Sequence, residues 1–222
     1  ALYTIYVSFA LFDFFNTKQK PKVFLLTFSV LFLSFVLGMR GRVGKDYYEY
    51  IRIFKESGTI GDLINGTFDH TFIHTEPLFT FINMILNSLN AEFYIMFFVF
   101  AFISLSVNHI AIKKYSPYVF LSILIYISHS FLLKELIQVR SGIASSILLF
   151  GIAYLYNKEF KKYTIVILAA SLFHKGAIIA FFLYLFNMFD FKKKTLYLLL
   201  FAAIVVSFIG VFDIAIHLLQ SI

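Results

Sequence analysis

Eight apolar runs, separated mostly by short polar connections, constrain the fold of this 222-residue chain more than any other feature. Apolar residues make up 60% of the chain and charged residues 14%, whereas soluble domains are close to half apolar and a quarter charged. Such runs are typical of membrane helices, because a helix satisfies its own backbone polar groups within lipid. The runs are 2–15, 23–39, 77–89, 92–112, 117–133, 136–156, 163–188 and 195–219. We therefore predict an all-α, polytopic integral membrane protein with about eight membrane segments.

No repeat or linker divides the chain, so we expect a single transmembrane domain over residues 1–222 with one long outer loop, 40–75. The first run has only 14 residues. As a helix it would reach about 21 Å, which is short of a hydrocarbon core of about 30 Å. Because the chain begins with Ala1 and stops soon after an apolar run, we expect it to be part of a longer protein.

Lysine clusters predict the orientation, because short cytoplasmic loops of membrane proteins are enriched in basic residues. The clusters are Lys18/Lys20/Lys22, Lys113/Lys114, Lys158/Lys161/Lys162 and Lys192/Lys193/Lys194. They account for much of the net charge of +7, so we expect contact with anionic lipid and no nucleic-acid partner. An even number of crossings between clusters requires the 163–188 run to break near His174 and Gly176. It also requires part of 77–112 to be re-entrant or interfacial.

Arg140 is the most informative single residue. A guanidinium at bilayer depth costs from about 3 to over 10 kcal/mol, so such a residue normally faces a protein interior or a wet cavity that holds an anion. The simpler alternatives are an ion pair with Glu135 or snorkelling to the interface. In the predicted orientation other basic residues share the outer side with Arg140, which favours an anion-binding role.

Three further stretches face the same side. The basic residues and glycines of 40–50 suit a phosphate-type anion, although a charged helix cap is an equal alternative. The tyrosines there fit either a sugar-binding surface or an interfacial belt. Glu76 before Pro77 is an ordinary helix start when it is considered alone. His174 beside Lys175 fits a structural role or proton transfer. No spacing typical of a metal site occurs, so we expect neither a metal nor a cofactor.

Four motifs in this order resemble the EpsG-like family of bacterial polysaccharide polymerases, which is akin to the Wzy type of O-antigen polymerase. They are Arg42…Asp46-Tyr-x-x-Tyr50…Phe54, Glu76-Pro-Leu-Phe79, Gln138-Val-Arg-Ser-Gly-Ile-Ala144 and Ala170-Ser-Leu-Phe-His174-Lys-x-Ala177. One departure is Arg140-Ser141, where the family often has Arg-Gln. The resemblance implies a substrate on the outer face of the bacterial cytoplasmic membrane, namely an oligosaccharide repeat linked to undecaprenyl pyrophosphate. It also implies a flippase and a chain-length regulator as possible partners.

We therefore expect a metal-independent membrane glycosyltransferase that polymerises such repeats into surface polysaccharide. Arg140 would stabilise the departing pyrophosphate, and a base would take the proton of the acceptor hydroxyl. The expected catalytic residues are Arg140, His174, Asp46 and Glu76, and the expected substrate-binding residues are Arg40, Arg42, Lys45, Tyr47, Tyr50, Gln138 and Lys175. The leading alternative is a lipid-linked-glycan flippase or other transporter. A membrane acyltransferase fits less well, because His174 lacks a neighbouring Asp or Asn, and a structural membrane subunit is the remaining alternative.

Overall fold

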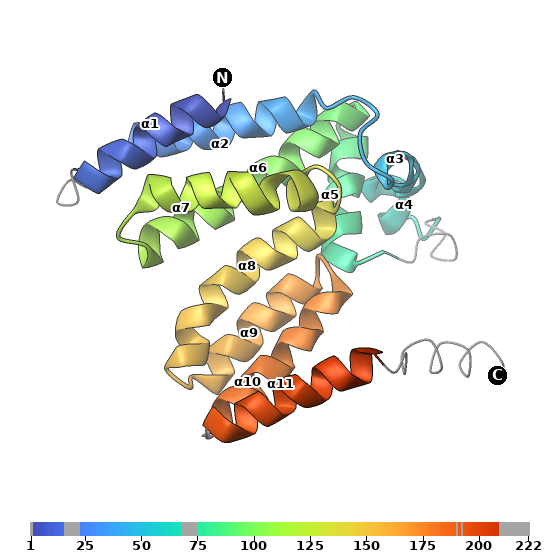
Figure 1. Ribbon diagram of the computed structural model, residues 1–222. Coiled ribbons are helices and arrows are strands. Elements are labelled where there is room, and N and C mark those ends of the chain that lie inside the picture. The colour runs from blue at the N-terminus through green and yellow to red at the C-terminus, as the bar shows by residue number, and fades with distance from the viewer. Residues whose placement is uncertain (1, 16–22, 68–74, 190, 192, 209–222) are drawn as a thin grey trace. The chain divides into compact units, whose positions relative to one another are not determined.

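The computed structural model describes residues 2–15, 23–67, 75–189, 191 and 193–208, and every regular element in these ranges is a helix (Figure 1). The α-helices are α1 (Leu2–Phe15), α2 (Val23–Gly38), α3 (Tyr47–Glu56), α4 (Ile60–Ile64), α5 (Pro77–Ser88), α6 (Phe93–Tyr115), α7 (Val119–Tyr126), α8 (Val139–Tyr156), α9 (Phe160–Ser171), α10 (Phe181–Met188) and α11 (Lys193–Phe208). A π-helix, η1 (Ile127–Glu135), continues α7, and a 3-10 helix, η2 (Lys175–Ala180), precedes α10. The predicted all-α class is confirmed for the described residues.

Within the described residues several apolar runs coincide closely with helices: the run 77–89 corresponds to α5, which ends at Ser88, and the run 136–156 contains α8, which ends at Tyr156. Within the described residues, two helices are long and apolar enough to cross a membrane, namely α6 with 23 residues and α8 with 18. Helix α2 and the other apolar helices are shorter. The number of about eight membrane segments therefore stays a prediction.

The chain divides into two compact units, Ala1–Tyr184 and Leu185–Ile222. The first unit contains α1 to α9 and η2, and it holds nearly all of the buried side chains of the described residues. In the second unit, α11 is a single apolar helix. This division does not test the prediction of one membrane domain over 1–222, which stays a prediction.

One part of the core lies among α1, α2, α6 and α7. Leu33, Leu37, Leu105 and Ile123 are among its most deeply buried members. A chain of hydrogen bonds also crosses it: the Tyr6 hydroxyl bonds to the hydroxyl of Ser29, and Ser29 Oγ lies 3.0 Å from Nε2 of His109. These bonds satisfy polar groups that would otherwise be costly to bury. They give His109 a structural place between helices.

A second part of the core joins α3, α5, α6 and α8. Phe79 of α5 stacks on Phe100 of α6 with ring centroids 4.4 Å apart, and both rings are fully buried. Tyr50 of α3 packs on Phe79 at 5.9 Å, and Ile143 of α8 belongs to the same cluster. This packing holds the start of α5 against the start of α8, where predicted site residues lie.

The 163–188 run is broken, as its topology requires. Helix α9 ends at Ser171, the backbone of His174 is extended, and η2 begins at Lys175. The chain then turns back along α9. One contact between the two segments is the hydrogen bond from the Tyr163 hydroxyl to the carbonyl of Ala180, at 2.9 Å. The predicted break near His174 and Gly176 is confirmed.

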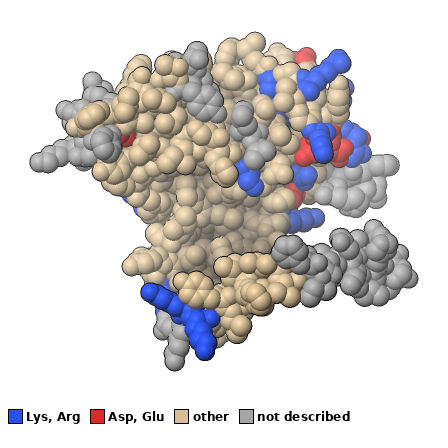
Figure 2. All heavy atoms as spheres, viewed as in Figure 1, with Lys and Arg blue, Asp and Glu red and all other residues tan. Residues whose placement is uncertain are grey.

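The predicted outer loop contains two short helices, α3 and α4. Thr59 and Asp62 form a reciprocal capping box at the start of α4. On α3, Arg52 pairs with Glu49 at 2.5 Å. Figure 2 shows charged side chains of both signs gathered over this part of the molecule. The loop residues 68–74 and the lysines at 18, 20, 22 and 192 lie outside the described residues.

Candidate active site

The carboxylate of Glu76 gathers three of the predicted site residues. Its Oε2 accepts a hydrogen bond from Nη1 of Arg140 at 2.7 Å. Its Oε1 accepts one from the backbone N–H of Lys175 at 3.0 Å and lies 3.5 Å from Nδ1 of His174. The Glu76 side chain is only 5% exposed, while those of Arg140 and His174 are 27% and 41% exposed. A buried carboxylate therefore fixes basic groups that remain open to a ligand.

Local backbone geometry explains how Glu76 reaches these partners. Glu76 is the N-cap residue of α5, with Pro77 in the first turn, but its side chain makes no capping bond to its own helix. The backbone N–H of Leu78 instead donates to the carbonyl of Leu172 at 3.1 Å, which ties the start of α5 to the α9–η2 turn. The helix start expected from the sequence is present. The Glu76 carboxylate, however, bonds to α8 and η2 instead of capping α5.

An aromatic wall lies beside the Arg140 guanidinium. Its Cζ is 5.8 Å from the ring of Phe79 and 5.9 Å from the ring of Tyr50. Arginine over an aromatic face gains roughly 0.5–2 kcal/mol, with the larger value where water is excluded. The guanidinium is therefore positioned by both rings as well as by its bond to Glu76.

The electrostatics of the cluster keep Glu76 ionised. Burial alone would raise the pKa of the Glu76 carboxyl, but the hydrogen bond from the Lys175 N–H and the charge of Arg140 outweigh it. The pKa lies below its ordinary value. For Tyr50, burial raises the pKa, the nearby Arg140 opposes this shift and Asp46 reinforces it. Asp46 and Arg140 thus both act on the Tyr50 hydroxyl.

The sequence family is decided by comparison with known proteins. The model of the EpsG family matches residues 23–222, which is most of the chain. The chain belongs to the EpsG family. A curated relative, the amylovoran biosynthesis protein AmsC of Erwinia amylovora, is 25% identical over 156 residues. That match covers 68% of this chain and 41% of AmsC, so the chain spans about two-fifths of the length of this relative. No solved structure matches the chain.

In this membrane protein of the EpsG family, the four stretches that carry the resemblance lie at neighbouring places in the first unit. Glu76, Arg140, His174 and Lys175 come together, and Tyr50 lies beside them. The remaining predicted residues surround α3 or precede α8. Arg42, Lys45 and Asp46 are exposed before α3, Gln138 is exposed before α8, and Tyr47 is buried with its ring stacked on Phe97.

Arg40, an expected substrate-binding residue, is held by other groups of the protein. Its guanidinium lies 3.7 Å from the centroid of the Phe97 ring. Its Nη1 donates to the carbonyls of Glu135 at 3.1 Å and Leu136 at 2.5 Å. Arg40 is buried and satisfies the carbonyls at the end of η1, which are otherwise unpaired at a helix end.

The suggested ion pair of Arg140 with Glu135 is wrong. Arg140 pairs with Glu76, and the Glu135 carboxylate instead binds the hydroxyls of Tyr126 and Ser104. The two acids face different sides of α8. Glu135 was missed as a separate polar centre, although it is the one acidic residue between positions 93 and 156 of this EpsG-family chain. An isolated acid in so long an apolar tract is itself a signal for function.

Proposed function

We propose that this chain belongs to a membrane glycosyltransferase that polymerises oligosaccharide repeats carried on undecaprenyl pyrophosphate, at the outer face of the bacterial cytoplasmic membrane. Membership of the EpsG family and the relative named for amylovoran biosynthesis support a role in exopolysaccharide synthesis. One observation carries the proposal: the Arg140 guanidinium is fixed on Glu76 beside His174 and Lys175.

Arg140 has the geometry to hold a pyrophosphate. Glu76 engages Nη1, and the planar guanidinium carries further N–H donors that suit two phosphate oxygens. Negative charge grows on the pyrophosphate as the anomeric C–O bond of the donor sugar breaks. Arg140 would stabilise this charge with a pre-oriented donor, and the exposed Lys175 would add a second cation. These two cations would stabilise the negative charge of the leaving group without a metal.

His174 is the best placed of the three candidate bases. Its Nδ1 faces Glu76, so Nε2 is left to receive the proton of the acceptor sugar hydroxyl as that hydroxyl attacks the anomeric carbon. Glu76 would orient the imidazole and stabilise its protonated form, as a carboxylate does beside a catalytic histidine. Glu76 itself is a weak proton acceptor, because its pKa is lowered. Asp46 lies one helical turn before Tyr50, whose N–H donates to the Asp46 carbonyl. The Asp46 carboxylate would contact sugar.

The exposed polar residues around α3 and the start of α8 suit the sugar portion of the substrate. Tyr50 forms part of the wall beside Arg140, and Arg42, Lys45 and Gln138 are free on the surface to form hydrogen bonds. Tyr47 would support Tyr50 through its packing on Phe97 rather than touch sugar. A flippase and a chain-length regulator are the protein partners that we propose for such a polymerase.

Reconstitution distinguishes this proposal from its main alternative. The full-length protein, purified into liposomes with lipid-linked repeats, should convert them into a ladder of longer lipid-linked chains. Movement of the repeats across the bilayer without chain growth would instead identify a transporter. A strain lacking the protein should display single repeats on its surface polysaccharide when this is analysed on gels. Unchanged long polymer in that strain would contradict the proposal.

A further inference from the structure

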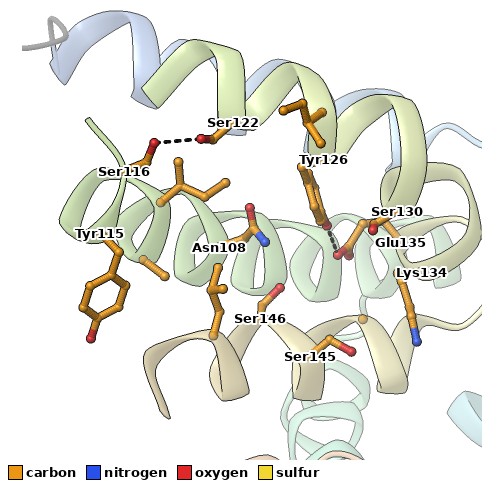
Figure 3. Close-up of a pocket in the computed structure, with 15 residues that line it drawn as sticks. Asn108, Tyr115, Ser116, Ser122, Tyr126, Ser130, Lys134, Glu135, Ser145 and Ser146 are labelled. Carbon is orange, nitrogen blue, oxygen red and sulfur yellow. Dashed lines mark hydrogen bonds between the residues drawn. The ribbon is translucent and has the colours of Figure 1, made fainter. Parts of the chain in front are cut away.

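A cavity of about 550 Å³ lies between α6, the α7–η1 segment and α8 (Figure 3). Its volume falls in the range of small-molecule sites. The α8 residues that line it are Gly142, Ser145, Ser146 and Leu149. At 100° per residue these lie on the side of the helix away from Arg140. The cavity is therefore separated from the Arg140 cluster by the width of one helix.

The surface of this cavity is mostly apolar, although many of its lining side chains carry polar groups. The Ser116 and Ser122 hydroxyls bond to each other at 2.8 Å, and the Tyr126 hydroxyl donates to Glu135 (Figure 3). The unpaired oxygens Oδ1 of Asn108 and Oε2 of Glu135 present almost no surface to an occupant. Polar groups that are already bonded or closed off gain little from a polar ligand, so the cavity suits an apolar one.

The cavity opens through exposed apolar side chains. Ile125 and Tyr115, which line it, are 60% and 38% exposed. Tyr115 belongs to α6, which is long and apolar enough to cross a membrane. In a bilayer an opening on such a surface faces lipid chains instead of water. A chain could therefore enter the cavity sideways from the membrane.

One end of the cavity carries a cation. Figure 3 shows Lys134 at this end, below Glu135. The Lys134 ammonium has three donors, one of which bonds to Ser141 Oγ at 3.0 Å. Among the described residues Lys134 forms no ion pair, and the Glu135 carboxylate is only 2% exposed and is held by the hydroxyls of Tyr126 and Ser104. An anionic group at this end would gain a charged donor.

We propose that this cavity holds part of the prenyl chain of a second lipid-linked substrate, with its pyrophosphate at Lys134, and this proposal rests on the polymerase function above for the identity of the chain. One apolar cavity with one cation at its end matches a single chain with an anionic head, whereas a phospholipid brings two chains. In the predicted orientation Lys134 lies on the outer side, where the substrate is displayed.

Chain growth requires two lipid-linked molecules in the same turnover, because donor and acceptor are both carried on undecaprenyl pyrophosphate. The anomeric C–O bond of the donor breaks, and its lipid pyrophosphate leaves at Arg140. The acceptor hydroxyl oxygen bonds to the anomeric carbon and gives its proton to His174. The acceptor keeps its own pyrophosphate, so its lipid must be held elsewhere. Helix α8, about 10–12 Å wide with its side chains, would keep the two lipids apart.

Photocrosslinking tests the position of the chain without any need for polymer formation. The probe is farnesyl pyrophosphate with a benzophenone at the far end of its prenyl chain. It is added to the full-length protein in phosphatidylcholine nanodiscs, and adducts are mapped by mass spectrometry. They should lie away from Lys134, at residues 111–115 of α6 or at Leu149 of α8. Unlabelled farnesyl pyrophosphate should suppress them.

Lys134→Gln should raise the concentration of farnesyl pyrophosphate needed for this suppression about tenfold, because it removes the charged donor. Lys114→Gln is the matched control and should change nothing, since Lys114 packs over the rings of Tyr115 and Phe150 and does not line the cavity. Farnesol, which has the chain but no charge, should compete equally in the wild-type protein and in Lys134→Gln, because the cavity itself is unchanged.

Four results would overturn the inference. They are adducts outside the cavity, equal suppression by dioleoylphosphatidylglycerol, equal effects of Lys134→Gln and Lys114→Gln, and weaker competition by farnesol after Lys134→Gln, which would show that Lys134 shapes the cavity instead of binding the head. Correct crosslinking without a polymer ladder in the reconstitution would count against the proposed function alone. A polymer ladder without crosslinking in the cavity would count against this inference alone.

Discussion

Oε2 of Glu76 and Nη1 of Arg140 lie 2.7 Å apart, although 64 residues separate them in the chain. The carboxylate is buried and the guanidinium is about a quarter exposed. The pair therefore fixes one end of a cation whose other donors remain available. Such a pair pre-orients Arg140 for an anion without neutralising the site, because Lys175 and His174 surround the same carboxylate.

Replacing Arg140 should stop polymer formation. Arg140→Ala removes the cation that meets the leaving group, and Arg140→Lys should restore little, because an ammonium lacks the planar fork. By analogy with the loss of one oxyanion donor, the expected loss is about 2–4 kcal/mol, or roughly a hundredfold or more in rate. Polymer length and amount on gels measure it. Arg52→Ala is the control, since Arg52 pairs on the exposed surface of α3. Normal polymer from a well-expressed Arg140→Ala strain would contradict the assignment.

Glu76 should matter for stability as well as for activity. Glu76→Gln leaves Arg140 without its ionic partner and weakens the contact to the Lys175 N–H. Because Arg140 is partly exposed, we expect a loss of about 1–3 kcal/mol, which is less than for a fully buried pair. Thermal unfolding in detergent measures this loss. The double variant Glu76→Gln/Arg140→Gln should lose less than the sum of the two single variants. Strict additivity would show that the pair contributes nothing.

Gly176 controls the position of the His174 ring. A Cβ on Gly176 would come within 2.7 Å of Nε2 of His174, so Gly176→Ala should turn the imidazole away. The protein should fold normally, since a side chain can move at low cost, but the rate of polymerisation should fall about tenfold or more by loss of the positioned base. Gly41→Ala is the matched control, because a Cβ there meets nothing within 4 Å. Equal rates for the two variants would argue against His174 as the base.

Orientation can be tested with single cysteines in this cysteine-free chain. An impermeant thiol reagent added outside intact cells should label cysteines at 174–176 and in the 40–67 part of the outer loop. Cysteines at 158–162 should react only after the membrane is opened. The reason is the lysine asymmetry between these segments. Outside labelling at 158–162 would reverse the predicted orientation and move the Arg140 cluster to the cytoplasmic side.

Periodicity and charge allowed much of the helical plan to be predicted. The 23–39 run became α2, and the 163–188 run broke where a histidine, a lysine and a glycine interrupt it. Local sequence was sufficient in these cases, because a polar residue in an apolar run marks a turn wherever the rest of the chain lies. The same reasoning predicted that Glu76, Arg140 and His174 share one side of the membrane; the structure brings them together, and the side that they face stays a prediction.

Pairing between distant side chains was not predictable in the same way. The sequence offered Glu135, only five positions away, as the partner of Arg140, but α8 turns Arg140 toward Glu76 instead. Arg40 donates hydrogen bonds to two carbonyls and packs on Phe97, and these contacts also depend on how α2 and η1 meet. The π-helix was not predicted, because its residues form an ordinary apolar pattern and the extra residue per turn is set by packing.

Helix η1 contains about one residue more per turn than an α-helix does. Removing one residue from 127–131 would therefore let a turn close as α-helix over nearly the same angle, and Glu135 would still point toward Ser104. In an ordinary α-helical stretch the same deletion would rotate every later side chain by roughly 100° about the helix axis. The π-helix thus allows the chain to lose a residue at 127–131 without changing the direction of the carboxylate that follows.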